Sequence, residues 1–144
     1  MRKFKIIFFT GILGLIVSCQ TYKIIYVPTD GVTAKKGFSS ILKENQLFLV
    51  FAKSYGRSKV KVVENDKIIF DSLMPAPRKN TAQAFKVNIN SVITISFDDI
   101  KKTLTILPEQ MEKYKFIYIE KKKKKVSVEF INGTKIFDDK PDLD

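Results

Sequence analysis

The sequence predicts an all-β protein, an antiparallel β-sandwich of about eight or nine short strands. Short runs rich in Val, Ile, Phe and Tyr recur roughly every ten residues, and turn residues separate them. Beyond the N-terminal region, no stretch shows the 3.6-residue periodicity of a long amphipathic helix. These observations favour an immunoglobulin-like or transthyretin-like sandwich, with a small barrel as the alternative.

The first two expected strands differ in how they are bounded and covered. Tyr22–Val27 is a short apolar run that stops at Pro28, which cannot donate to a sheet ladder. Thr29–Asn45 reads as a loop, and Ser39–Glu44 within it is compatible with one helical turn. Leu47–Ala52 is apolar on both faces, so we expect a central strand that is covered on both sides.

The next two strands are expected to form a hairpin. Lys59–Val63 alternates, and Val60 and Val62 share one face. Asn65-Asp66 then separates this run from Lys67–Asp71 at the spacing of a two-residue turn. A polar loop that contains two prolines follows.

Three more expected strands lie in the centre of the chain. They are Ala84–Val87, Val92–Phe97 and Thr103–Leu107. Pro108 ends the third, and residues 109–114 are expected to form a helical turn or an irregular bridge.

The last expected strands are Lys115–Glu120, apolar on both faces, and Val126–Phe130, which alternates. Asn132-Gly133 is the strongest turn signal in the chain, because a type I′ turn needs two residues that tolerate positive φ. It predicts a hairpin to Lys135–Phe137. The acidic segment 138–144 is expected to be a solvated tail, or else to fold back on a lysine run; in the latter case truncation after Phe137 would strengthen binding to anionic vesicles.

The N-terminal region has the organisation of an export signal. Three cationic residues, Arg2, Lys3 and Lys5, precede an apolar run, Ile6–Val17. A helix of this length would span roughly 18 Å, too short for a hydrocarbon core of about 30 Å. A secretory signal helix therefore fits better than a permanent membrane span.

The end of this run, Ile16-Val17-Ser18-Cys19, resembles the lipobox of bacterial lipoprotein precursors. The resemblance covers residues 1–19 and implies lipid transfer to the Cys19 thiol and cleavage between Ser18 and Cys19. By the sorting rule of enteric lipoproteins, Gln20 in place of aspartate implies the outer membrane. No family is recognised for the rest of the chain.

These observations divide the chain into four segments. Residues 1–18 are the expected signal peptide, and residues 19–28 are the lipidated N-terminus with the first strand. Residues 29–137 form the expected sandwich, and residues 138–144 the tail. The part that remains after cleavage is long enough to bury a core of its own.

The charge is strongly positive, with a formal net charge of +11. Three of the 26 cationic residues and none of the 15 acidic residues lie in the leader, which leaves about +8. Such a balance favours anionic lipid headgroups, acidic glycans or an acidic protein as partners. Nucleic acid is not expected as a partner of an exported protein.

The composition excludes several kinds of chemistry. The chain has no histidine, no tryptophan and one cysteine, which lipidation would consume. Zinc sites and histidine-based catalysis therefore lack their usual groups, and no phosphate loop or dinucleotide motif is present. Asp98-Asp99 is too short a motif to predict calcium, and Tyr55 alone is too little to predict a sugar platform. We expect no enzyme activity, no cofactor and no metal.

One charged feature exceeds the background, a run of five lysines formed by Lys121, Lys122, Lys123, Lys124 and Lys125. The run lies between two expected strands, so it is interpreted as a solvated hairpin tip. Its role is either solubility and protection against edge-to-edge aggregation or contact with an anionic surface.

Together these features predict a lipid-anchored, non-catalytic binding or assembly module of the bacterial cell envelope. We expect it in the outer membrane facing the periplasm, rather than on the outer face of the cytoplasmic membrane. The expected partners are the membrane, through acylated Cys19, and an envelope protein or an anionic lipid or glycan. The alternatives are capture of an acidic glycan or phosphorylated lipid, and an envelope hydrolase that uses carboxylates alone.

Overall fold

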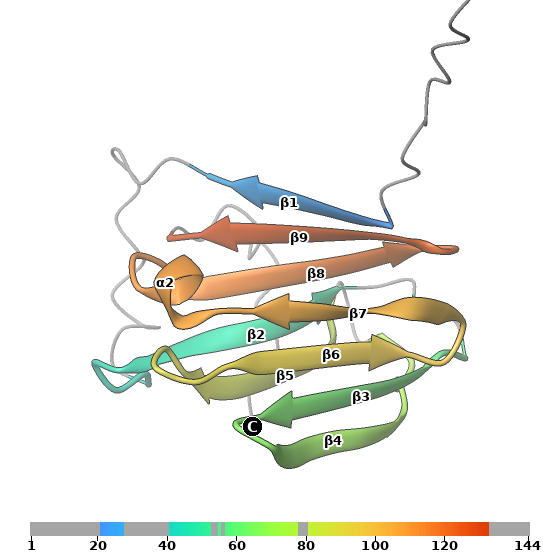
Figure 1. Ribbon diagram of the computed structural model, residues 1–144, viewed down its shortest axis with the longest axis horizontal. Coiled ribbons are helices and arrows are strands. Elements are labelled where there is room, and N and C mark those ends of the chain that lie inside the picture. Colours follow the sequence, from blue (N-terminus) through green and yellow to red (C-terminus); the bar gives the residue numbers. More distant parts are fainter. Residues whose placement is uncertain (1–20, 28–40, 53–54, 56, 78–80, 133–144) are drawn as a thin grey trace, which may run out of the picture.

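The structure is a computed structural model that describes residues 21–27, 41–52, 55, 57–77 and 81–132. These residues form nine strands and one short helix (Figure 1). The elements are β1 (Tyr22–Tyr26), β2 (Gln46–Ala52), β3 (Lys59–Glu64), β4 (Lys67–Leu73), β5 (Thr81–Asn88), β6 (Ile93–Phe97), β7 (Ile100–Ile106), α2 (Pro108–Met111), β8 (Phe116–Lys122) and β9 (Lys125–Ile131).

The strands form two sheets, so the all-β class is confirmed. One sheet has the order β1-β9-β8-β2-β5, and the other has the order β4-β3-β6-β7. In the view of Figure 1 the four-stranded sheet lies in front of the five-stranded sheet. The four-stranded sheet is antiparallel throughout.

The expectation of an entirely antiparallel protein is wrong for the five-stranded sheet. In it β1 pairs with β9, and β2 pairs with β8, in the parallel direction. Parallel neighbours need a connection that crosses over, so they come from strands that are far apart or not consecutive in the chain. The pairs β2/β5 and β8/β9 are antiparallel, which makes this sheet mixed.

The larger hydrophobic cluster lies between the two sheets. It takes alternate side chains from both of them, including Leu47, Leu49 and Phe51 of β2 on one side and Val60 and Val62 of β3 on the other. On its other face β2 also buries Phe48 and Val50, in a smaller cluster with residues of β8. The prediction of a central strand covered on both faces is therefore confirmed.

The predicted strands coincide with the observed ones, apart from their ends. Each of the nine runs from Tyr22 to Phe130 overlaps one strand, while β5 and β7 each begin three residues earlier than expected. The turn at Asn65 and Asp66 is confirmed, because both residues have positive φ, of 43° and 65°.

The helical predictions have mixed outcomes. The helical turn expected after Pro108 is present as α2, whose Met111 is fully buried. The described part of the helical turn expected at Ser39–Glu44, residues 41–44, is not helical. Within the ranges given above, no helix is long and apolar enough to cross a bilayer.

Other predictions concern residues outside the described ranges. These are the signal peptide, Cys19, the part of the expected hairpin from Gly133 to Phe137, and the acidic tail.

Candidate functional site

One end of the molecule, on the right in Figure 1, brings together the start of β1 and the turn between β8 and β9. The register pairs Tyr22 with Val126, at the start of β9. The Val126 amide donates to the Thr21 carbonyl at 2.8 Å, so the chain joins the sheet directly after Gln20. We call this region the basic end, defined by Lys23, Lys121–Lys125 and the turns beside them.

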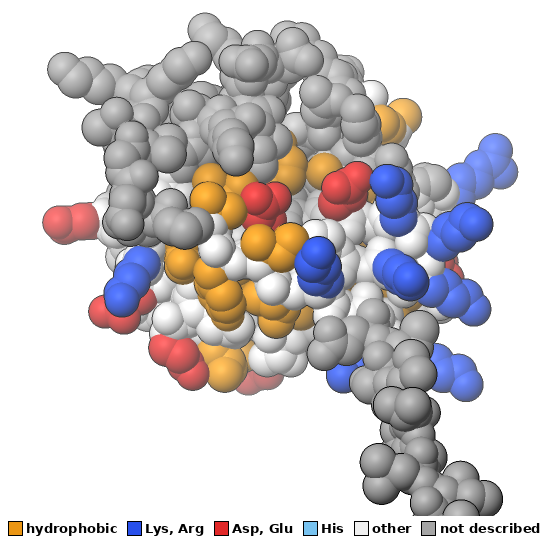
Figure 2. All heavy atoms as spheres, turned by 90° about the horizontal axis from the view of Figure 1, so that it is seen from above, with side chains coloured by type: hydrophobic (Ala, Val, Ile, Leu, Met, Phe, Trp, Pro, Cys, Tyr) orange, Lys and Arg blue, Asp and Glu red, His pale blue; other side chains and the backbone are white. Residues whose placement is uncertain are grey.

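The lysine run forms the hairpin tip that the sequence predicts. Lys122 and Lys125 are paired across the two strands, and the turn between them contains Lys123, whose φ is 55°. Four of the five lysines, Lys122 to Lys125, are exposed. Figure 2, seen from the β1 side, shows Lys and Arg side chains gathered at this end of the molecule.

Lys121 departs from the prediction, because its side chain is only 5% exposed. Along β8 it continues the inward row of Ile117 and Ile119, both fully buried. Strand alternation therefore directs Lys121 into the fold. The expectation that all five lysines are solvated at the hairpin tip is therefore wrong for Lys121.

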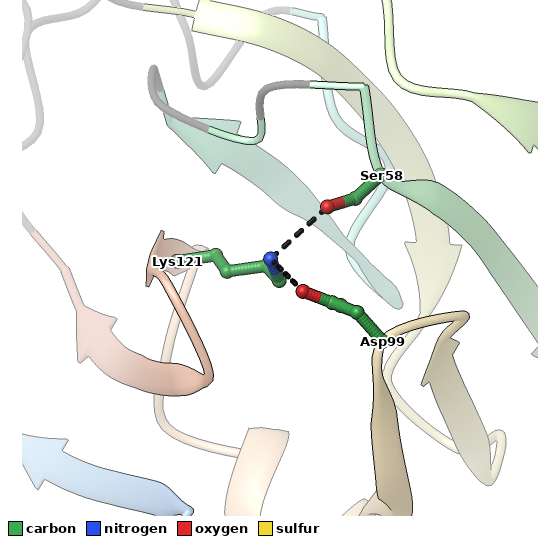
Figure 3. A network of polar contacts seen from close by, with 3 residues as sticks. All are labelled: Ser58, Asp99 and Lys121. Atoms are coloured by element: carbon green, nitrogen blue, oxygen red, sulfur yellow. Dashed lines mark hydrogen bonds and ion pairs between the residues drawn. The ribbon is translucent and has the colours of Figure 1, made fainter.

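A polar network holds the buried ammonium group (Figure 3). Lys121 Nζ donates to Asp99 Oδ2 at 2.7 Å and to Ser58 Oγ at 3.0 Å. Asp99 lies in the turn between β6 and β7, and Ser58 directly precedes β3. Because β8 belongs to one sheet and the other two positions belong to the second, the network links the sheets at the basic end.

The contact between Ser58 and Lys121 invites comparison with a serine–lysine nucleophile pair. In such a pair a neutral amine takes the proton of the hydroxyl group. Here the carboxylate of Asp99 forms an ion pair with the same nitrogen, at 2.7 Å. The arrangement therefore suits a structural link better than a nucleophile.

Asp99 also belongs to the Asp98-Asp99 motif, which was considered above for calcium binding. Its carboxylate is engaged by Lys121. In the described part of the chain, no group of three or more His, Cys, Asp or Glu side chains is placed to hold a metal ion.

Tyr55 lies next to this network and is 3% exposed, so it offers no surface for a sugar. Its hydroxyl donates to the Ile119 carbonyl, and its ring contacts those of Phe51 and Phe97. Burial raises the pKa of Tyr55 above its ordinary value of 10.0, and the negative charge of Glu120 adds to this increase.

The raised pKa of Tyr55 predicts a loss of stability in alkali. In the unfolded chain the phenol ionises near pH 10.0, whereas in the fold it stays protonated. This contribution to stability is complete below pH 10.0 and is lost as the pH rises above it. At one pH unit above the unfolded pKa the loss is about 1.4 kcal/mol.

Urea unfolding at pH 8 and pH 11 measures this effect. The free energy of unfolding should fall less between pH 8 and pH 11 in Tyr55→Phe than in wild type. Tyr26→Phe, at an exposed tyrosine, is the control and should fall as much as wild type. An equal decrease in wild type and in Tyr55→Phe would contradict the assignment.

Comparison with known proteins finds no match among protein-family models, curated proteins or solved structures.

Reasoning from the sequence missed the residues that hold Lys121. Ser58 and Asp99 are distant from it in the chain, and no local pattern connects them. A signal for Lys121 itself was present, since it lies two and four residues after Ile119 and Ile117 and so falls on the same face of the strand.

Proposed function

We propose that the chain is a lipid-anchored, non-catalytic binding or assembly module of the bacterial cell envelope, attached through Cys19. One observation carries the proposal. The first described strand begins at Tyr22, three residues after Cys19, and joins the sheet beside the exposed lysines of the hairpin tip. The strand that follows Cys19 in the chain therefore begins at the end of the fold that carries the exposed lysines.

The short distance along the chain supports an orientation for the domain. Three residue steps span at most about 11 Å, so an acylated Cys19 would hold the basic end close to the headgroups. This distance is comparable to the Debye length of about 8 to 10 Å at physiological ionic strength. Each exposed lysine near an anionic surface contributes about 1 kcal/mol. Since the acyl chains supply the affinity, the lysines would set the orientation.

We further propose that the two sheets form a β-sandwich. The core that they share supports this arrangement. The location proposed from Gln20 is the outer membrane, on its periplasmic face.

The test of the anchor is the chemical state of Cys19 in protein purified from bacterial membranes. Mass spectrometry should find a chain that begins at Cys19 and carries acyl groups. Cys19→Ser should lose the acyl mass and keep its leader, because the acceptor thiol is gone. Ser18→Ala keeps a small residue before the cysteine and should still be acylated. An intact Met1 and a free thiol in the wild-type protein would overturn the proposal.

The assembly role has a separate test. Crosslinking in membranes followed by purification should recover a stoichiometric envelope protein with the acylated chain. Recovery of lipid or glycan alone would favour the second candidate, a ligand-binding lipoprotein, which the next observation supports.

A further inference from the structure

A hollow lies at the basic end, on the outer face of the five-stranded sheet. Its volume is about 470 Å³, within the range of about 300 to 1,000 Å³ that is typical of small-molecule sites. It lies where β1 and β9 begin and β8 ends. The described residues that line it are Thr21, Lys23, Glu120, Lys122, Lys125, Val126 and Ser127.

Three lysines converge on this hollow from three strands. Lys122 and Lys125 are directly paired across β8 and β9, and Lys23 is paired with Ser127, two residues after Lys125. Directly opposite residues have Cβ atoms about 4.5 to 5.5 Å apart, and diagonal neighbours about 7 to 8 Å, so long side chains reach a common point. All three lysines are exposed.

These lysines form no ion pair within the described ranges. The ion pairs found there join Lys59 to Asp71 and Lys121 to Asp99, and neither includes a lysine of the hollow. Like charges directly opposite each other on a sheet are destabilising. An anion held between the ammonium groups would remove this repulsion.

The remaining side chains limit which anion fits. Glu120, paired with Ser127, places one carboxylate among the three ammonium groups. The hydroxyl groups of Thr21 and Ser127 add short donors at the same place. A small group with several acceptor oxygens and a compact charge matches this set of donors, because lysine binds phosphate as a point charge.

We infer that the hollow lined by Lys23, Lys122 and Lys125 binds one phosphate group. The phosphate belongs either to a lipid headgroup or to a soluble phosphate. A lipid headgroup as the source of the phosphate requires the proposed membrane attachment. Binding of a phosphate group in the hollow does not require it. The volume of the hollow leaves room for a substituent attached to the phosphate.

The test uses the full chain, labelled with ¹⁵N, in micelles of an uncharged detergent. One titration adds inorganic phosphate, a second adds phosphatidylglycerol to the micelles, and a third adds phosphatidylcholine as the zwitterionic control. Saturable shifts of the amide signals of Lys23, Val126 and Ser127 are expected in at least one of the first two titrations. Shifts with inorganic phosphate indicate a soluble ligand, and shifts with phosphatidylglycerol alone indicate a lipid headgroup.

Substitutions separate a specific site from general attraction. Lys122→Gln should weaken the apparent affinity about five-fold, as expected for the loss of one lysine at an anionic group. Glu120→Gln should strengthen it by a similar factor. Lys67→Gln removes the same charge from the exposed first residue of β4 and should leave the affinity unchanged. The turn between β3 and β4 lies at the opposite end of the sheets (Figure 1).

Two results would overturn the inference. One is the absence of saturable shifts with both phosphate and phosphatidylglycerol. The other is an equal effect of Lys122→Gln and Lys67→Gln, which would indicate an unspecific response to net charge. Neither result depends on the acylation of Cys19, so failure of this site and failure of the proposed anchor are distinguishable.

Discussion

Phe130→Ala is expected to lower the free energy of unfolding by about 3 to 5 kcal/mol. Phe130 is fully buried in β9, and its ring stacks on that of Tyr26 at 4.9 Å between centroids. It also contacts the Tyr114 ring at 5.5 Å, next to α2. Truncation would remove these contacts and leave a cavity between β1 and the rest of the core.

Urea unfolding measures the loss, and hydrogen exchange locates it. The amides of β1 should lose more protection than those of β3, because Tyr26 packs directly on Phe130 and the Val27 amide donates to the Phe130 carbonyl. Ile68→Ala, at a side chain that is 52% exposed, should change the stability by less than about 1 kcal/mol. Similar losses for both substitutions would contradict this account of the core.

Asp99→Ala is expected to lower the free energy of unfolding by about 2 to 3 kcal/mol. The substitution leaves the ammonium group of Lys121 in the fold without its counter-charge. Removal of one partner from a fully buried pair costs about 3 to 5 kcal/mol. For Asp99→Ala we expect a smaller loss of about 2 to 3 kcal/mol, because the Asp99 side chain is 38% exposed and water reaches the site.

Two further variants test the cause of this loss. Lys121→Met combined with Asp99→Ala should recover most of the stability, since an apolar side chain of similar length needs no counter-charge. Asp71→Ala breaks the exposed ion pair with Lys59, at 3.1 Å, and should cost less than about 1 kcal/mol. If the double variant is as unstable as Asp99→Ala, the buried charge is not the cause.

The strand positions were predictable because their signals are local. Leu47–Ala52 is apolar on both faces, and the structure places it in the interior of a sheet with both faces covered. The alternation of Val60 and Val62 places both in the core. The turn at Asn65-Asp66 has its own chemical signal, which needs no knowledge of the rest of the fold.

The partners of the strands were not predictable in the same way. A parallel pairing such as that of Leu49 with Ile117 joins segments 68 residues apart, and the alternation of each strand is the same whichever neighbour it takes. The direction of pairing depends on how the whole chain crosses between the sheets.

The candidate site, too, was predictable only where its signals are local in the sequence. The hairpin tip follows from the spacing of the lysine run, and its structure agrees with the prediction. The run of five lysines does not by itself separate Lys121, which is buried, from its exposed neighbours. The hollow depends on Lys23, which the chain brings beside Ser127 only through the pairing of β1 with β9.

The direction of β1 has a mechanical consequence. β1 runs parallel to β9 at the edge of its sheet, and the chain leaves toward Cys19 from the first residue of the strand. A pull along the axis of β1 would load the hydrogen bonds between β1 and β9 together, in shear. An edge strand pulled sideways would instead open one bond at a time.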